Sequence, residues 1–311
     1  MGIDLNSVQL LIRARKDGIS FTNMATFGRQ RLLGDRDVLV SVLRGSGYDV
    51  PVDLARKLRD PATEYAEDFF RLLGAERICA IDFSDFEGAQ ILHDMNHPIP
   101  NSLIDSFDLV LDGGTLEHIF DLPTSLRNAA QMVRPNGWFI SLTQTNNFCG
   151  HGFYQFSPEL FYRFFCLENG YKTEECLIWE DIPRSIFYRV PDPDAVQTRI
   201  NLTSKFGTYM MVRARRIGQA NRDFVPQQSD YVRLWNEQPG RSGTLKHSDL
   251  TGLAKLRSTL RGIPPLRSSV LFARKLLRAK TRRALAEYRD LRIERNAHGL
   301  LTPLADLRVI R

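Results

Sequence analysis

The sequence lacks the patterns that mark several common classes of protein. No apolar run approaches the roughly 20 residues that a membrane-spanning helix needs. Only four cysteines occur among 311 residues, and they form neither a C-x-x-C pair nor the spacing of a zinc site. We therefore expect reduced core thiols and no bound metal. No G-x-G-x-x-G follows the first expected strand, which disfavours a dinucleotide or nucleotide-sugar enzyme.

The N-terminal residues also lack the features of a secretory signal. Asp4 comes early, and the apolar stretch 8–12 is too short for the core of a signal peptide. With 43% hydrophobic and 25% charged residues, the composition is that of a chain that buries a large core. We therefore expect a cytoplasmic protein.

Positive charge is concentrated at the C-terminal end. Residues 241–311 contain 17 Lys and Arg against 5 Asp and Glu, whereas the whole chain has a net charge of +6. The pattern at 264–295 predicts a long basic amphipathic helix, with Arg274, Arg278 and Arg282 on one face. Such a helix could lie on the inner membrane surface, bind an acidic partner, or dock on its own domain or a second copy of the chain. The absence of interleaved aromatic residues disfavours nucleic acid.

Alternating strand and helix patterns predict a doubly wound α/β fold. The apolar run 107–112 is typical of a strand buried on both faces. We expect a Rossmann-like, mostly parallel seven-stranded sheet with an antiparallel edge strand. Residues 1–218 would form this domain, with a helical insertion at 31–75, and residues 219–311 a basic, mainly helical extension. The predicted strands are 19–27, 77–83, 89–93, 107–112, 138–143, 172–180 and 208–216, and the predicted helices are 36–43, 63–73, 122–133 and 157–166.

Several motifs follow one another in a fixed order in the second half of this domain. Phe107-Asp108 opens the buried strand, Leu116-Glu117-His118 follows it, and Pro135-Asn136-Gly137 precedes the next strand. The segment 151–171 opens a helix with Phe-Ser-Pro and ends at Gly-Tyr, and 208–216 reads as a closing strand. This order resembles the class I S-adenosylmethionine-dependent methyltransferases.

The resemblance implies an enzyme that transfers a methyl group from S-adenosylmethionine to a small-molecule or glycan acceptor. It extends over about residues 19–218. The segment 151–159 is similar to that of accessory enzymes in bacterial surface-polysaccharide biosynthesis, which favours a glycan. The oligomeric state stays open, and a homo-oligomer is one alternative.

Acidic residues follow two of the predicted strands. Asp82 ends the second strand, where a carboxylate can accept both hydroxyls of a ribose, and Asp94 resembles the family's adenine-contacting position. The alternatives are a helix cap or loop carboxylate for Asp82 and a turn former for Asp94. The resemblance places further residues in the cofactor pocket: Gly28, Arg29, Met95, Asp112, Gly113, Glu117 and His118.

Residues after the fifth strand are candidates for catalysis. His151 lies between two glycines, and its ordinary pKa near 6.5 suits a general base. Tyr154 could orient the acceptor, together with Asn146 and Gln155. The alternative for His151 is an exposed loop histidine.

The first turn departs from the family pattern. Methyltransferases of this class usually have a glycine-rich loop there, whereas residues 24–30 (MATFGRQ) contain only Gly28. Either Gly28 alone makes the turn and Arg29 and Gln30 supply polar groups, or cofactor binding has been lost. The second account would make the chain a non-catalytic binding or scaffold protein.

Overall fold

A computed structural model describes residues 2–60, 62–182, 185–237 and 302–308. The chain divides into two compact units, one formed by residues 1–229 and 293–311 and the other by residues 230–292. The described part of the second unit lies in helix α7 (Ser229–Glu237). The predicted basic helix at 264–295 lies outside the described residues. None of the described helices is long and apolar enough to cross a membrane.

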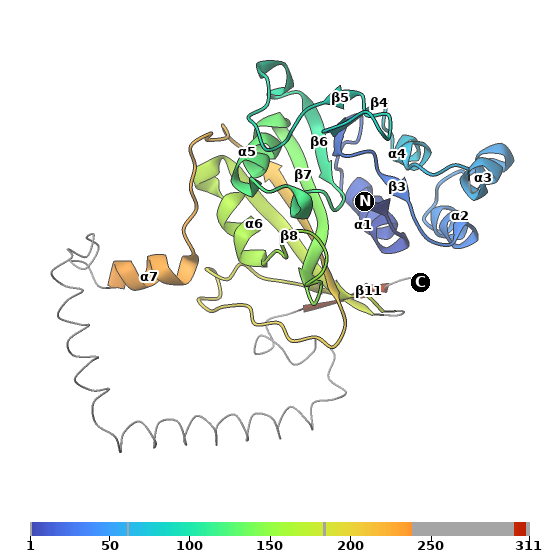
Figure 1. The fold of residues 1–311 in the computed structure, drawn as a ribbon. Helices are drawn as coiled ribbons and strands as arrows, with labels where there is room; N and C mark the ends of the chain where they lie inside the picture. Colours follow the sequence, from blue (N-terminus) through green and yellow to red (C-terminus); the bar gives the residue numbers. More distant parts are fainter. Residues whose placement is uncertain (1, 61, 183–184, 238–301, 309–311) are drawn as a thin grey trace. The chain divides into compact units, whose positions relative to one another are not determined.

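A nine-stranded sheet organises the first unit (Figure 1). The strand order is β11-β9-β8-β10-β7-β6-β2-β4-β5; the strands from β7 to β5 pair in parallel, and the others pair antiparallel. The predicted Rossmann-like fold is confirmed, and β9 and β11 extend its antiparallel edge beyond the seven predicted strands. The bounds are β2 (Asn23–Phe27), β4 (Arg77–Asp82), β5 (Ile91–Leu92), β6 (Phe107–Asp112), β7 (Val133–Asn146), β8 (Tyr171–Glu180), β9 (Ile186–Arg189), β10 (Thr208–Arg216) and β11 (Thr302–Arg308).

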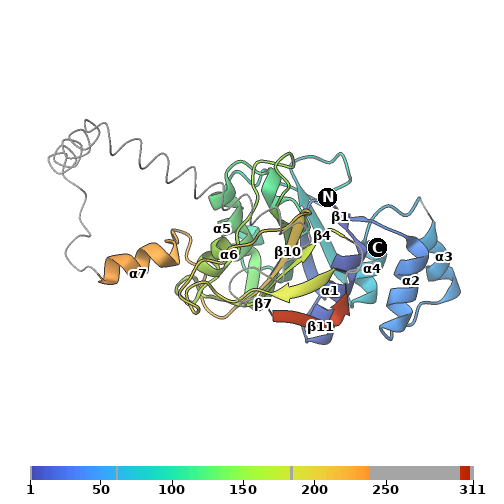
Figure 2. The same cartoon turned by 90° about the horizontal axis from the view of Figure 1, so that it is seen from below.

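Helices cover both faces of the sheet (Figures 1 and 2). Strand β6 shows the reason, because Leu109 and Leu111 belong to the apolar core under one helical layer and Phe107 and Val110 to the core under the other. The first layer contains α1 (Leu5–Lys16), α2 (Arg36–Gly45), α3 (Val52–Arg59) and α4 (Glu67–Leu72), and the second contains α5 (Leu122–Met132) and α6 (Pro158–Phe164).

The N-terminal segment forms a helix that the sequence analysis did not predict. The carboxylate of Asp4 caps α1 by accepting from the backbone N–H of Ser7 at 2.8 Å. Just before it, β1 (Gly2–Ile3) pairs in parallel with β3 (Arg31–Leu32). This pairing fixes the start of the chain beside the turn that follows β2.

A buried ion-pair network ties α1 to the antiparallel part of the sheet. Glu175 on β8 is 2% exposed and pairs with Arg13 of α1 at 2.8 Å. Arg213 of β10 and Arg189 of β9 reach the same carboxylate at 2.8 and 2.7 Å. Because three cations surround one buried anion, their attraction offsets the cost of removing the Glu175 carboxylate from water.

The parallel strands define where a ligand is expected. Their order, β5-β4-β2-β6-β7, reverses direction between β2 and β6. In open α/β sheets ligands bind beyond the carboxyl ends of the strands at this switch point. Here that edge carries the turn after β2, the loop after β6 and the N-terminal segment.

Candidate functional site

A cavity of about 230 Å³ lies at the carboxyl ends of β6 and β7. Asp4 and Ser7 from the start of α1 line one side of it, so the N-terminal segment closes this edge of the sheet. The remaining lining residues come from β1, the loops after β3, β6 and β7, and strands β7, β8 and β10: Gly2, Leu33, Gly113, Gly114, Glu117, His118, Leu142, Thr143, Gln144, His151, Trp179 and Tyr209.

The loop after β6 is held by a buried carboxylate. Asp112 is 0% exposed, and its Oδ1 accepts from the backbone N–H groups of Thr115 and Leu116 at 2.8 and 3.2 Å. Its Oδ2 accepts from the hydroxyl of Ser141 at 2.7 Å. Burial raises the pKa of Asp112, and these hydrogen bonds oppose the rise. Asp112, predicted as a cofactor ligand, thus shapes the turn that presents Glu117.

Glu117 is the buried acid of the cavity wall. Its side chain is 1% exposed, and its Oε2 accepts from the hydroxyl of Thr143 at 3.1 Å. Burial, reinforced by the charge of nearby Asp112, raises the pKa of Glu117 to about 7. Its backbone carbonyl accepts from the N–H groups of Phe153 and Tyr154 at 2.7 and 3.2 Å, which holds the loop after β7 against it.

That loop brings two histidines to Glu117. The His118 and His151 rings are exposed, and their centroids are 4.9 Å apart. One nitrogen of each ring and one Glu117 carboxylate oxygen all lie within 4.8 Å of one another. Burial, followed by the proximity of His151, lowers the pKa of His118 and favours its neutral form.

Two buried polar groups of the cavity wall have no partner among the described residues. Gln144 is 4% exposed and no group donates to its Oε1; Trp179 is 2% exposed and no group accepts from its Nε1. The ring of Trp179 stacks on Tyr209 with centroids 5.8 Å apart. Because buried polar groups are nearly always hydrogen-bonded, these two atoms are candidates for hydrogen bonds to a ligand once the wall shifts to expose them.

The turn after β2 is closed by a side chain. Gln30 is 2% exposed, and its Nε2 donates to the carbonyl of Phe27 at 2.6 Å. Its Oε1 has no partner among the described groups and lies so close to Gly113 that a Cβ there would be 2.2 Å from it. Gly28 makes the turn with φ +66°, as predicted for a single glycine. Gln30 therefore fills the corner between the ends of β2 and β6.

The predicted ribose ligand lies at the same edge. Asp82 ends β4, and its Oδ1 accepts from the backbone N–H of Phe83 at 2.7 Å. It lines none of the described cavities. Its position suits the predicted role, which stays a prediction.

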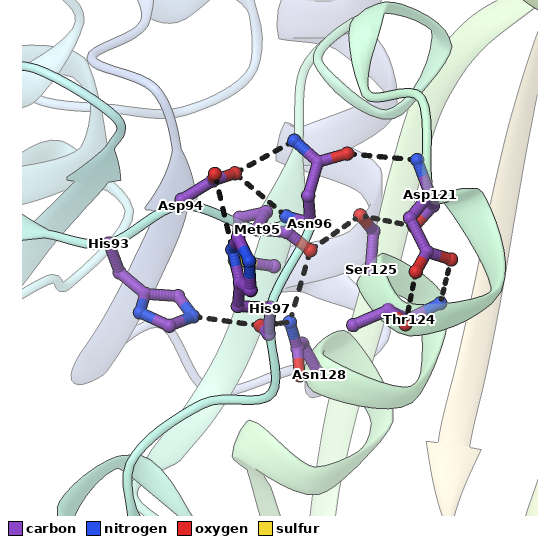
Figure 3. A network of polar contacts seen from close by, with 9 residues as sticks. All are labelled: His93, Asp94, Met95, Asn96, His97, Asp121, Thr124, Ser125 and Asn128. Carbon is purple, nitrogen blue, oxygen red and sulfur yellow. Dashed lines mark hydrogen bonds and ion pairs between the residues drawn. The ribbon is translucent and has the colours of Figure 1, made fainter.

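The predicted adenine ligand belongs to an ordered loop after β5 (Figure 3). The carboxylate of Asp94 accepts from the backbone and side-chain amides of Asn96 at 2.9 and 2.7 Å, and His97 lies 3.2 Å from it. The hydrogen bonds from Asn96 lower the pKa of Asp94. Asn96 in turn accepts from the backbone N–H of Asp121, so the loop is fastened to the start of α5. Asp94 thus also fulfils the turn-forming alternative.

Three other predicted residues lie away from the cavity. The Arg29 guanidinium pairs with Glu67 at 2.6 Å and lies over the Tyr65 ring. Met95 is 5% exposed and packs in the apolar core. The Tyr154 hydroxyl donates to the carbonyl of Phe120 at 2.7 Å. Each has a structural contact that accounts for it, and their functional assignments stay predictions.

Several residues of the cavity wall were not predicted from the sequence. Thr143, Gln144 and Trp179 lie on strands that read as buried, and nothing in their spacing marks them. Asp4 could have been recognised from the sequence, because an Asp directly before a helical segment is a typical N-cap. Gln30 was interpreted as a supplier of polar groups, not as the side chain that fills the corner.

Part of the chain matches a known family. Residues 65–141, which run from just before α4 into β7, match the family model described as Methyltransferase domain. The chain contains a methyltransferase domain. This match agrees with the predicted class I methyltransferase, for which S-adenosylmethionine is the predicted cofactor. The match includes Asp82, Asp94 and Glu117, and it begins after the corner that Gln30 fills.

Solved structures similar to this methyltransferase have low sequence identity. A Bacillus halodurans protein described as a methyltransferase is 10% identical with a TM-score of 0.37, over 67% of this chain and 98% of that one. The N-methyltransferase NodS of Bradyrhizobium japonicum, in complex with S-adenosylhomocysteine, is 11% identical with a TM-score of 0.35, over 67% and 85%. A Thermus thermophilus branched-chain polyamine synthase is 11% identical with a TM-score of 0.35, over 71% and 58%. No curated protein matches the sequence.

The edge of the sheet carries the predicted nucleoside ligands on one side and is closed by Gln30 on the other. Asp82 and Asp94 follow β4 and β5, where a nucleoside is recognised in this fold. The corner above Gly113 is filled by Gln30, whose Nε2 donates to the carbonyls of Phe27 and Gly28 at 2.6 and 3.5 Å and whose Oε1 has no partner among the described groups. Asp82 and Asp94 would therefore hold the nucleoside, and Gln30 has to turn away for the rest of the cofactor to approach Gly113.

Proposed function

We propose that this methyltransferase methylates an oxygen of a small hydroxylated acceptor, such as a single sugar unit, held in the 230 Å³ cavity. The observation that carries the proposal is the pair of unpartnered buried groups in the cavity wall, Gln144 Oε1 and Trp179 Nε1. A hydroxyl group both donates and accepts, so one sugar can satisfy both of them. Satisfying two buried groups that otherwise lack partners favours such a ligand over an apolar one of equal size.

The size and walls of the cavity support the same class of acceptor. Its volume lies below the roughly 300–1,000 Å³ of sites for drug-sized ligands, so the occupant is a small molecule or one unit of a larger one. The ring of Tyr209, which stacks on the buried Trp179, offers an apolar surface, while Asp4, Ser7 and Gln144 offer polar groups. This combination suits a molecule with an apolar face and a polar rim.

The residues of the site would orient the acceptor and remove its proton. Bound S-adenosylmethionine supplies an electrophilic methyl group on sulfur. Holding the acceptor hydroxyl in line with that group provides much of the rate. Glu117, His118 and His151 line the same cavity as Gln144, and they are the groups there that can assist departure of the hydroxyl proton.

The proposal is tested by measuring release of S-adenosylhomocysteine with monosaccharides and nucleotide sugars as acceptors, beside protein and RNA. We expect turnover with a sugar. Trp179→Phe keeps an aromatic ring, although a smaller one, and removes the donor; it should raise KM for that sugar about 2- to 13-fold, as expected for one lost hydrogen bond of about 0.5–1.5 kcal/mol. Trp235→Phe, on the exposed helix α7, is the matched control and should leave KM unchanged. Turnover with protein or RNA but with no sugar would contradict the proposal, as would an unchanged KM in Trp179→Phe.

A further inference from the structure

Three metal-ligating side chains meet in the wall of the cavity: the carboxylate of Glu117 and the imidazoles of His118 and His151. We propose that they bind a divalent transition-metal ion such as Zn²⁺. Two imidazoles and one carboxylate form a known ligand set for such ions, which bind three protein groups and keep the remaining positions for water or substrate. The spacing of residues in the sequence gave no indication of this site, because His151 is brought to Glu117 only by the fold.

The positions of the ligand atoms are close to those that a metal requires. Ligands of a tetrahedral Zn²⁺ site, each about 2.1 Å from the ion, lie about 3.4 Å from one another. The three ligand atoms here lie within 4.8 Å of one another. Both imidazoles are exposed side chains, so small rotations close the remaining gap without moving the buried Glu117.

The surroundings of Glu117 resemble the outer shell of a metal site. Thr143 donates to Glu117 Oε2 at 3.1 Å and thereby orients the carboxylate. Hydrogen-bonded partners of this kind fix the ligands of metal sites and strengthen binding. The loop that carries His151 is fastened to the carbonyl of Glu117, and Gly152, at φ +74°, fits against that carbonyl where a Cβ would come within 2.7 Å. The backbone therefore positions two of the three ligands relative to each other.

The open positions of the ion would face the cavity, since all three ligands line it. An acceptor hydroxyl bound there is polarised and gives up its proton more easily. This role rests on the proposed function. Binding of the ion does not, because it requires only the three side chains.

Metal binding is measured on tag-free, full-length protein by calorimetric titration with Zn²⁺ and by the visible absorption of bound Co²⁺. Neither measurement uses S-adenosylmethionine or an acceptor, so a failure of the proposed function would leave the result intact. We expect one ion per chain, Co²⁺ bands that report mixed nitrogen and oxygen ligands, and no displacement by excess Mg²⁺, which prefers all-oxygen sites.

Variants connect the signal to the three side chains. His151→Ala, at an exposed loop position, and Glu117→Gln, of the same shape, should each lose the Co²⁺ bands or weaken binding at least 10-fold. Thr143→Val should weaken it about 10-fold through the orientation of Glu117. His93→Asn removes a half-buried histidine outside the cluster and should bind as the parent does. Absence of binding by the parent protein, or equal binding by His151→Ala, would overturn the proposal.

Discussion

Gln30 provides a direct test of how the cofactor reaches this site. Its side chain occupies the corner between β2 and β6, with Oε1 against Gly113 and Nε2 hydrogen-bonded to Phe27. If S-adenosylmethionine needs this space, part of its binding energy is used to turn Gln30 out. Gln30→Ala removes that cost and should therefore bind the cofactor more tightly than the parent.

The size of the effect follows from what Gln30 loses when it moves. The displacement breaks the 2.6 Å hydrogen bond to Phe27, which contributes about 0.5–1.5 kcal/mol, and a weaker one of 3.5 Å to Gly28. The unpartnered Oε1 gains solvent, which offsets part of the cost. A gain of about 1 kcal/mol in the alanine variant corresponds to roughly 5-fold tighter binding. The free energy of unfolding should fall by less than about 2 kcal/mol, because the lost hydrogen bond is accompanied by removal of an unsatisfied oxygen.

Calorimetry with S-adenosylmethionine and S-adenosylhomocysteine measures both affinities. Gln30→Leu is the matched control: it keeps an apolar side chain of similar bulk in the corner and should show no gain. If the alanine variant binds no more tightly than the parent, the cofactor does not need the corner, and the reasoning about Gln30 is refuted.

Three further changes follow from the structure. Glu175→Ala leaves three arginines without their shared buried anion and should lower the free energy of unfolding by about 3–5 kcal/mol in urea titrations. Glu174→Ala, at a half-exposed neighbour, should lower it by less than about 1 kcal/mol, and equal decreases in the two variants would contradict the role of burial. Gly152→Ala should lower Tm and methyl transfer together, because its φ of +74° and the Glu117 carbonyl both oppose a Cβ, whereas Gly150→Ala meets open space and should change neither. Asp82→Asn should weaken S-adenosylmethionine binding about 10-fold or more in calorimetry if the carboxylate holds the ribose, and unchanged affinity would remove it from the site.

Regular elements with strong local patterns were predicted closely. Strand β6 (Phe107–Asp112) and strand β10 (Thr208–Arg216) have the predicted bounds; in β6 the cause is a near-continuous apolar run that ends at Asp112, as is typical of a buried strand. The four-residue strand β9 and the seven-residue strand β11 were not predicted. They pair with each other although they are distant in the sequence, and no local pattern records that pairing.

The candidate site was predicted in part. Glu117, His118 and His151 were each identified, but with separate roles in cofactor binding and catalysis. Their meeting at one point depends on two backbone hydrogen bonds to the Glu117 carbonyl, which local sequence does not encode. Gln144 and Trp179 were not predicted as site residues, because the sequence does not show whether the polar atoms of a buried strand residue have hydrogen-bond partners.

The sequence by itself determined the alternation of strands and helices in the central part of the domain, the acidic residues at the strand ends and the resemblance to methyltransferases. Those properties depend on patterns within a few residues of one another, and the period of apolar residues expresses them directly. Only the tertiary structure decided that Gln30 fills the corner over Gly113 and that His151 joins Glu117 and His118. Both depend on close packing between segments far apart in the chain, where differences of an ångström decide what fits.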